Sequence, residues 1–213
     1  KKLRLGERPT ELRMKQAAAA VGQCRMMHIY DKLFAEYNRT VAQILLTGED
    51  VESPVRSEHL HNTFEALLEL GVIPVVNEND SVSSAEIETG QCKVLGDNDT
   101  LSAIVARLCR ADLLVLLSDI DGLYDKDPHR YPDAKLVSLV TEVTDELRAA
   151  AGGDGTARGT GGMQTKLDAA VLATSAGVDM VIANGARPEK LYDIAAGAEI
   201  GTRFQAKKRS GMV

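Results

Sequence analysis

The sequence contains little cysteine and few aromatic residues. Its 213 residues include three cysteines and no tryptophan, and aromatic residues make up only 4% of the chain. Cys24, Cys92 and Cys109 cannot all pair within one chain and lack metal-ligand spacing. We therefore expect reduced thiols and no protein-held metal. So few aromatic rings also argue against a surface that stacks on nucleic-acid bases.

An excess of basic charge and long apolar runs are also missing. Lys and Arg total 25 against 31 Asp and Glu, which leaves a formal net charge of -6. Nucleic-acid-binding proteins normally present a basic surface, so we expect no nucleic-acid partner. No apolar run approaches the roughly 18 residues of a membrane span, and no secretion leader is recognisable. The sequence predicts a cytoplasmic protein with no membrane partner.

The chain does contain a regular alternation of helical and strand-like segments. Apolar spacing and end signals predict helices over 10–37, 57–70, 99–110, 144–151, 163–176 and 188–196, and strands over 40–46, 72–76, 113–117, 136–140, 179–183 and 200–204. This order predicts an α/β fold, a mostly parallel open sheet with helices on both faces. Pro74 indicates an edge or irregular strand. Ligands should bind after residues 76, 117 and 183, where strands end.

Two clusters of carboxylates and amides form the first candidate site. Residues 77–80 (NEND) follow a strand, and residues 96–100 (GDNDT) open a helix. Such groups can hold an ammonium group, or orient a cation or a catalytic lysine. The structural alternative is turn and cap chemistry, with Asn98 or Asp99 simply capping the helix.

A glycine-rich segment, residues 159–166 (GTGGMQTK), is the second candidate. Its glycines allow close approach to phosphates, and a helix N-terminus offers free N–H groups. Lys166 falls one turn into that helix, where it could offset charge on a transferred phosphoryl group. The segment matches neither the P-loop nor the dinucleotide fingerprint. The alternative is a mobile surface loop, but a cation at this end of the helix dipole favours phosphate.

The third candidate, residues 118–128 (SDIDGLYDKDP), follows the most apolar strand. This is a ligand position in open sheets. Its aspartates do not match the calcium-binding EF-hand positions, and no Glu closes the loop. Turn chemistry is the alternative.

Together these segments resemble the glutamate 5-kinases, a group within the amino-acid kinase family. The motifs that carry the resemblance are VIPVVNENDSVSSAEI (72–87), LGDNDTLSAIVA (95–106), LLVLLSDIDGLYDKDP (113–128), GTGGMQTKLDAA (159–170) and MVIANG (180–185), with KQAAAAVGQ (15–23) and AQILLT (42–47) in support. The resemblance covers residues 5 to 208. NEND followed by GDND is its most particular feature.

The resemblance implies that ATP phosphorylates the γ-carboxylate of L-glutamate, the first step of proline biosynthesis. Mg²⁺ would be carried by the ATP phosphates, and no side chain need act as a base because the acceptor carboxylate is already ionised. Proline as a feedback inhibitor and a homo-oligomer, either dimer or tetramer, are further implications.

The resemblance also implies roles for individual residues. Lys166 would stabilise the transferred phosphoryl group, and Asp99 would orient the catalytic lysine. The implied substrate-binding residues are Asp80, Asn98, Asn77 and Asp97; the implied nucleotide contacts are Ser118, Asp119, Thr160, Gly161, Gly162, Met163, Gln164, Thr165 and Lys166.

One departure concerns the start of the chain. The family begins with a strand that bears a second phosphate-neutralising lysine, followed by a strand ending in Ser-Gly-Ala, whose serine contacts glutamate. The sequence begins at Lys1, beyond both. We therefore expect a single amino-acid kinase domain over 1–213 that is N-terminally incomplete, without the C-terminal RNA-modification-type domain of some members.

Three other interpretations remain open from the sequence. One is another amino-acid kinase, acting on acetylglutamate or carbamate. A second is a non-catalytic module that senses glutamate, proline or nucleotide. The third is a dinucleotide-binding oxidoreductase, which fits the α/β pattern but lacks its fingerprint.

Overall fold

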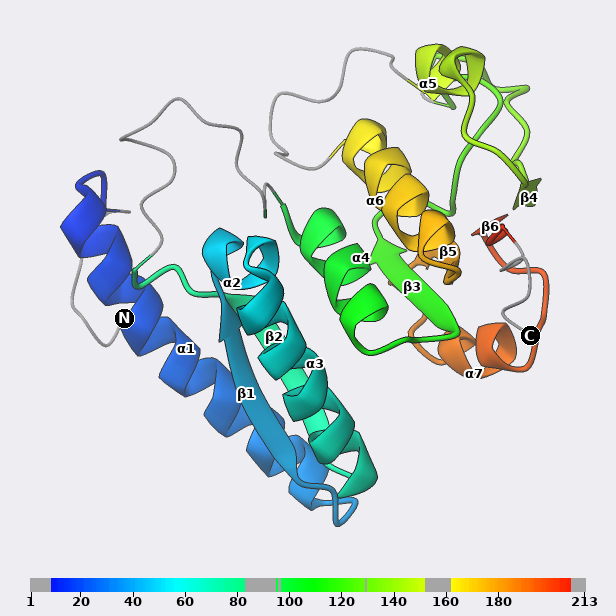
Figure 1. Ribbon diagram of the computed structural model, residues 1–213. Coiled ribbons are helices and arrows are strands. Elements are labelled where there is room, and N and C mark those ends of the chain that lie inside the picture. Colours follow the sequence, from blue (N-terminus) through cyan, green and yellow to red (C-terminus); the bar gives the residue numbers. More distant parts are fainter. Residues whose placement is uncertain (1–8, 83–94, 96, 129, 152–161, 208–213) are drawn as a thin grey trace. The chain divides into compact units, whose positions relative to one another are not determined.

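The computed structural model describes residues 9–82, 95, 97–128, 130–151 and 162–207 (Figure 1). Contacts between residues divide the chain into two compact units, residues 1–96 and 97–213. The described strands form a two-stranded sheet in the first unit and a four-stranded sheet in the second. Across the described ranges, no helix is long and apolar enough to cross a membrane.

The first unit consists of a small parallel sheet with three helices. Its elements are α1 (Leu12–Ala35), β1 (Val41–Leu46), α2 (Gly48–Glu52), α3 (Pro54–Glu69) and β2 (Ile73–Glu78). Leu46 and Phe64 are almost completely buried. By contrast, α1 has no buried residue, and its apolar residue Leu33 is 53% exposed. The predicted helix is confirmed, but none of its side chains is buried among the described residues.

Local capping explains where α2 and α3 begin. The α3 helix starts three residues before its predicted start because Ser53 caps it and Pro54 occupies the tolerant first position. The α2 helix has no counterpart in the prediction. The Asp50 carboxylate accepts hydrogen bonds from the backbone N–H and the hydroxyl of Thr47, at 2.9 and 2.7 Å, and closes its first turn.

Pro74 lies in β2 without interrupting the pairing. The strands β1 and β2 run parallel from Val41↔Ile73 to Leu46↔Glu78. The N–H of Ile73 donates to Thr40 O, and that of Asn79 to Leu46 O, so odd-numbered residues face β1. Pro74 therefore turns its missing N–H away from β1, as expected for an edge position.

The second unit contains the larger sheet. Its strands are β3 (Leu113–Ser118), β5 (Asp179–Asn184), β6 (Thr202–Phe204) and β4 (Leu139–Val140), in that spatial order. The pairs β3–β5 and β4–β6 are parallel, whereas β5–β6 is antiparallel. Together with β1–β2, three of the four strand pairings among the described residues are parallel, so the predicted mostly parallel α/β fold is confirmed.

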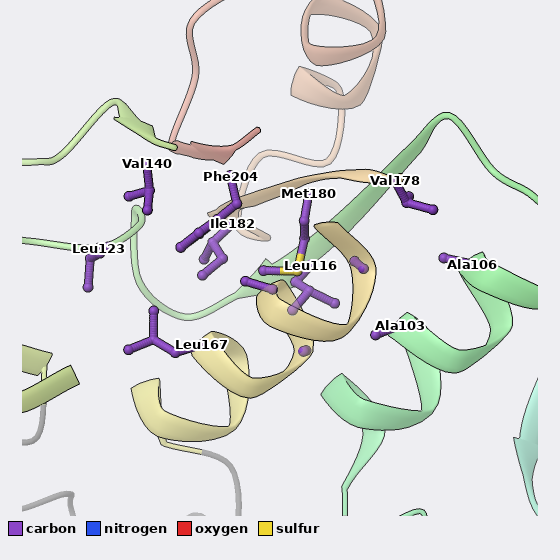
Figure 2. Packing of buried hydrophobic residues seen from close by; sticks show 13 residues of the cluster. Ala103, Ala106, Leu116, Leu123, Val140, Leu167, Val178, Met180, Ile182 and Phe204 are labelled. Atoms are coloured by element: carbon purple, nitrogen blue, oxygen red, sulfur yellow. The ribbon is translucent and has the colours of Figure 1, made fainter. Parts of the chain in front are cut away.

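Helices cover both faces of this larger sheet. Met180 and Ile182 pack with α4 (Asn98–Leu108) and α6 (Met163–Ser175) in the main core (Figure 2). The alternate residues Val181 and Ala183 pack with Ile194 of α7 (Lys190–Ala195) on the opposite face. This alternation is the period of two that a strand imposes on its side chains. The prediction of helices on both faces is confirmed for this unit.

The antiparallel strand β6 approaches β5 so closely that only glycine fits before it. Gly201 has φ +70, and a Cβ there would collide with the carbonyl oxygen of Ile182. Thr202 is buried; its hydroxyl donates to Val137 O at 2.6 Å and accepts from the Leu123 N–H at 2.8 Å. These bonds attach the segment after β3 to β6.

Several predicted boundaries are wrong by a few residues. The strand expected from residue 136 is only β4, and the helix expected at Pro188 begins at Lys190, with Pro188 in the preceding turn. The α5 helix (Asp145–Ala151) lies within one residue of its prediction.

Candidate active site

The lysine of the predicted phosphate loop forms an ion pair within the second unit. Lys166 Nζ donates to Asp99 Oδ2 at 3.0 Å, and the two side chains are only 11% and 17% exposed. The hydroxyl of Thr165 donates to the same carboxylate oxygen at 2.8 Å. Three residues that the sequence assigns to the site, Asp99, Thr165 and Lys166, are therefore in contact.

Two helices packed through small residues bring this pair together. The α4 helix carries Asp99 in its first turn, and α6 carries Lys166 in its first turn. They lie side by side (Figure 1), and Ala103, Ala106 and Ala170 are among the buried residues of their common core. Small side chains allow the two backbones to approach, which places both helix starts within reach of one ion pair.

The start of α6 has the features of an anion site. Gly162 occupies the cap position in an extended conformation, and a Cβ there would meet nothing within 4 Å. The first N–H groups of a helix have no partner within the helix and carry its positive dipole end. Lys166 adds a cation there, and the Asp99 carboxylate compensates for the repulsion by the dipole.

The remaining loop residues have different surroundings. Met163 packs partly against the core, and the Gln164 amide donates to Asp168 at 3.3 Å. Thr160 and Gly161, both predicted nucleotide contacts, lie outside the described residues.

A second cluster of polar residues lies in the same unit, at the carboxyl ends of β3 and β5. Ser118 ends β3, and its hydroxyl donates to the Asp119 carboxylate at 3.1 Å. The N–H of Gly185 donates to the carbonyl of Ser118 at 2.8 Å, directly after β5. Both predicted nucleotide contacts therefore lie at the sheet edge where open α/β folds bind ligands.

Two residues at this edge were not among the predicted site residues. Asn184 Nδ2 donates to Asp121 Oδ1 at 2.9 Å, and the hydroxyl of Tyr124 donates to the other oxygen of Asp121 at 3.2 Å. Partial burial and the Asp121 carboxylate raise the pKa of Tyr124 above its usual value. Asp121 and Asn184 both lie in the quoted motifs just where strands end, which is the signal that could have identified them.

At the start of α4, Asp97 has a structural role and Asn98 is exposed. Asp97 caps α4, because its Oδ1 accepts from the Thr100 N–H at 2.8 Å and its Oδ2 from the Thr100 hydroxyl at 3.3 Å. The capping alternative is therefore correct for Asp97, rather than for Asn98 or Asp99. Asn98 is exposed at the first helical position, which leaves its side chain accessible to a ligand.

The first unit contains a cavity of about 200 Å³ where β2 ends. Asn77 and Asp80, two predicted substrate-binding residues, line it together with the α1 residues Ala19, Gly22 and Gln23. Asn77 Nδ2 donates to Gln23 Oε1 at 3.4 Å. Gln23 belongs to the KQAAAAVGQ motif, but no role was predicted for it.

Comparison with known proteins identifies the family. A family model described as "Amino acid kinase family" matches residues 2–184. The chain belongs to the amino acid kinase family. The match includes NEND, GDND, SDID and the GTGGMQTK segment with Lys166.

Several bacterial members of this amino acid kinase family share about half of their aligned residues with this chain. A glutamate 5-kinase of Clostridium perfringens (strain 13 / Type A) is 55% identical over 207 residues, which is 97% of this chain and 76% of that protein. A glutamate 5-kinase of Listeria monocytogenes is 49% identical over 207 residues, 97% of this chain and 74% of that protein. The resemblance to glutamate 5-kinases is therefore confirmed.

Solved amino acid kinase structures support the fold. The isopentenyl phosphate kinase of T. acidophilum, in a product complex, is similar with a TM-score of 0.53 and 20% identity, over 86% of this chain and 67% of that one. An isopentenyl phosphate kinase substrate complex gives a TM-score of 0.55 over 87% of this chain and 67% of that one, also at 20% identity. At this identity the likeness concerns the fold alone.

The chemistry available to this amino acid kinase divides between its two units. The second unit presents a helix N-terminus, a lysine and a polar sheet edge, which together suit a nucleotide's phosphates. The first unit presents a cavity with carboxylate and amide groups, which suits a small zwitterion. Within the described ranges, no group of three His, Cys, Asp or Glu side chains could hold a metal ion.

Proposed function

We propose that this protein transfers the γ-phosphoryl group of ATP to the γ-carboxylate of L-glutamate. The geometric observation that carries the phosphoryl-transfer part is the Lys166–Asp99 pair, 3.0 Å apart, which joins the first turns of α6 and α4. The choice of glutamate rests on relatives named glutamate 5-kinase that are 49 to 55% identical over 97% of the chain.

The reaction needs positioning and charge stabilisation more than proton transfer. An oxygen of the ionised γ-carboxylate attacks the γ-phosphorus, the bond to the β,γ-bridging oxygen breaks, and ADP leaves with that electron pair. A carboxyl group is ionised at neutral pH, so no base is required. An ammonium has three N–H donors. Lys166 can therefore keep its bond to Asp99 and donate to the transferred group, where negative charge is greatest.

The nucleotide would bind across the carboxyl edge of the larger sheet and the start of α6. Ser118 and Asp119 would contact the nucleoside end, and the N–H groups around Gly162 to Thr165 would receive the phosphates. When bound, Mg²⁺ would neutralise phosphate charge and would be carried by ATP. The residues at the start of α6 fit this arrangement. Lys166 is a cation and the helix N-terminus carries partial positive charge, so both favour an anion.

L-Glutamate would bind in the first unit's cavity. Asp80 would pair with the α-ammonium, and Asn77 would donate amide N–H groups to a carboxylate. In the second unit, Asn98 stays a predicted substrate contact, and Asp97 would support it by capping α4. A cytoplasmic location, inhibition by proline and a homo-oligomer are part of the same proposal, on the strength of the resemblance.

The deciding experiment is trapping of the acyl phosphate. Hydroxylamine converts glutamyl phosphate to a hydroxamate, so ATP- and L-glutamate-dependent hydroxamate should form with this protein. Lys166→Ala should lower the rate at least about a hundredfold, as expected for loss of a preorganised charge at the transferred group. Lys190→Ala is the matched control, because Lys190 makes an exposed ion pair on α7 and should leave the rate unchanged.

The same assay includes a version extended at its N-terminus by the two strands that precede this segment in the family. Activity in either version that disappears with Lys166→Ala supports the proposal. Ligand-induced stabilisation without product in both versions would instead favour a binding module. Turnover of acetylglutamate or carbamate in place of glutamate would reassign the substrate.

A further inference from the structure

We propose that Gln23 binds the α-carboxylate of the amino-acid substrate through its side-chain amide. The inference deepens the proposed function and rests on it. Gln23, on α1, lines the cavity of about 200 Å³ that Asn77 and Asp80 also line. Neither the motif assignments nor the resemblance gives this residue a role.

The hydrogen bonding of the Gln23 amide is incomplete. Its Oε1 accepts from Asn77 Nδ2 at 3.4 Å, which is longer than a typical N–H···O bond. Its Nε2 is shielded from solvent and has no hydrogen-bond partner, the only such side-chain atom in the described part of the chain. In this contact the Asn77 amide donates and the Gln23 carbonyl oxygen accepts, which leaves the Gln23 NH₂ as the group without a partner.

A buried N–H group without an acceptor is unfavourable, and native structures contain few of them. The terminal torsion of glutamine is soft and broadly populated. Rotation about it turns Nε2 toward the cavity at the expense of one long hydrogen bond. A carboxylate in the cavity would then accept a charge-assisted hydrogen bond, which is stronger than the bond given up.

The lining of the cavity, which includes Glu78 as well as Asp80, favours one of the two carboxylates of glutamate. Asp80 offers a carboxylate suited to the α-ammonium, and the α-carboxylate is attached to the same carbon as that ammonium. The γ-carboxylate has to meet the phosphoryl group of ATP and is not available to the wall of this cavity. Ala19, Ala20 and Gly22 line the α1 side of the cavity with small residues, which leaves room beside Gln23.

The test is a substitution that removes both amide groups at similar volume. Gln23→Leu should raise the dissociation constant for L-glutamate about ten- to a hundredfold, as measured by titration calorimetry. The KM for ATP should stay unchanged. Gln16→Leu is the matched control, since Gln16 lies about two turns earlier on the same helix and does not line the cavity. It should leave the affinity for glutamate unchanged.

A second ligand separates a direct contact from general damage to the fold. The probe 4-aminobutyrate keeps the ammonium and the reacting carboxylate of glutamate but has no α-carboxylate. Gln23→Leu should weaken the binding of glutamate. It should leave the affinity for 4-aminobutyrate unchanged. Equal losses for both ligands, or no loss for glutamate, would overturn the assignment.

The two proposals fail in different ways. If the unsubstituted protein binds L-glutamate but forms no hydroxamate, the phosphorylation proposal is wrong, and the affinity comparison still decides the role of Gln23. If it forms hydroxamate and Gln23→Leu binds glutamate normally, only the assignment of Gln23 is wrong. Failure to bind glutamate at all overturns both.

Discussion

The ion pairs Lys166–Asp99 and Lys190–Asp193 have nearly equal N–O separations, 3.0 and 3.1 Å. Their surroundings differ at the scale of the residue. The first pair is 11% and 17% exposed, whereas the second is 41% and 52% exposed. Water screens the second pair, but removal of one partner from the first leaves a poorly hydrated charge. Equal geometry therefore does not imply equal energy.

This difference predicts unequal effects of the same substitution at two sites. Asp99→Asn should lower the free energy of unfolding by about 2 kcal/mol, because the Lys166 ammonium would lose its charged partner while still partly buried. Asp193→Asn, the matched control, should cost less than about 1 kcal/mol. Urea unfolding followed by circular dichroism measures both. Equal losses in the two variants would show that burial does not govern the Lys166–Asp99 pair.

At the scale of the element, α2 depends on its first turn. It has only five residues, too few to be stable without interactions at its ends. The hydrogen bond from the Thr47 hydroxyl holds the pKa of the Asp50 carboxyl below its usual value, although partial burial opposes the shift. Arg56 contributes a further ion pair to Asp50 at 3.0 Å. The ionised form of Asp50 therefore stabilises the connection from β1 to α3.

This lowered pKa makes the contribution of Asp50 dependent on pH. A group whose pKa is lower in the folded state stabilises that state fully above its unfolded pKa, about 3.9 for Asp. The contribution is lost as pH falls through the folded-state pKa. Asp50→Asn should therefore cost about 1 kcal/mol near neutral pH. The difference from the unsubstituted protein should shrink as the pH approaches about 3.

The measurement is urea unfolding at a series of pH values. Glu49→Gln serves as the control, because Glu49 faces the same Arg56 at 3.6 Å but its side chain is 83% exposed. It should change stability by less than about 0.5 kcal/mol at every pH. A constant penalty for Asp50→Asn down to low pH would rule out the ionised carboxylate as its cause.

At the scale of the whole molecule, the proposed substrates bind mainly to different units. The cavity proposed to bind glutamate belongs to the first unit, and the Lys166 site and the β3–β5 edge belong to the second. A ligand suppresses the local opening of the segments that it contacts. Each substrate should therefore leave its own pattern of protection on the chain.

Hydrogen exchange can test this division. A non-hydrolysable ATP analogue should slow amide exchange around residues 118–121 and 162–166, and L-glutamate should slow it around 19–23 and 77–81. With Lys166→Ala, protection by the nucleotide should weaken while protection by glutamate persists. Protection of residues 19–23 by nucleotide alone would contradict the proposed division.

Much of this arrangement was predictable because its signals are local. Gly71 at φ +69, just after α3, is an end signal that the prediction used, whereas the equally local Ser53–Pro54 signal was overlooked and the start of α3 was predicted three residues late. The place of Asp119 after an apolar strand was also predictable. The α2 helix was missed because a five-residue helix is too short to show an apolar period. Gln23 was missed because a helical glutamine has no pattern that separates a cavity residue from a surface one.

By itself the sequence determined the order of helices and strands except for α2, the family, and the segments proposed to carry the chemistry. These depend on spacing, caps and motifs within a few residues of one another. Only the tertiary structure decided which distant groups meet. Asp99 and Lys166 are 67 positions apart, Asp121 and Asn184 are 63 apart, and Gln23 and Asn77 are 54 apart. Such contacts, like the antiparallel pairing of β6, depend on how whole elements pack, and no local pattern in a chain encodes that packing.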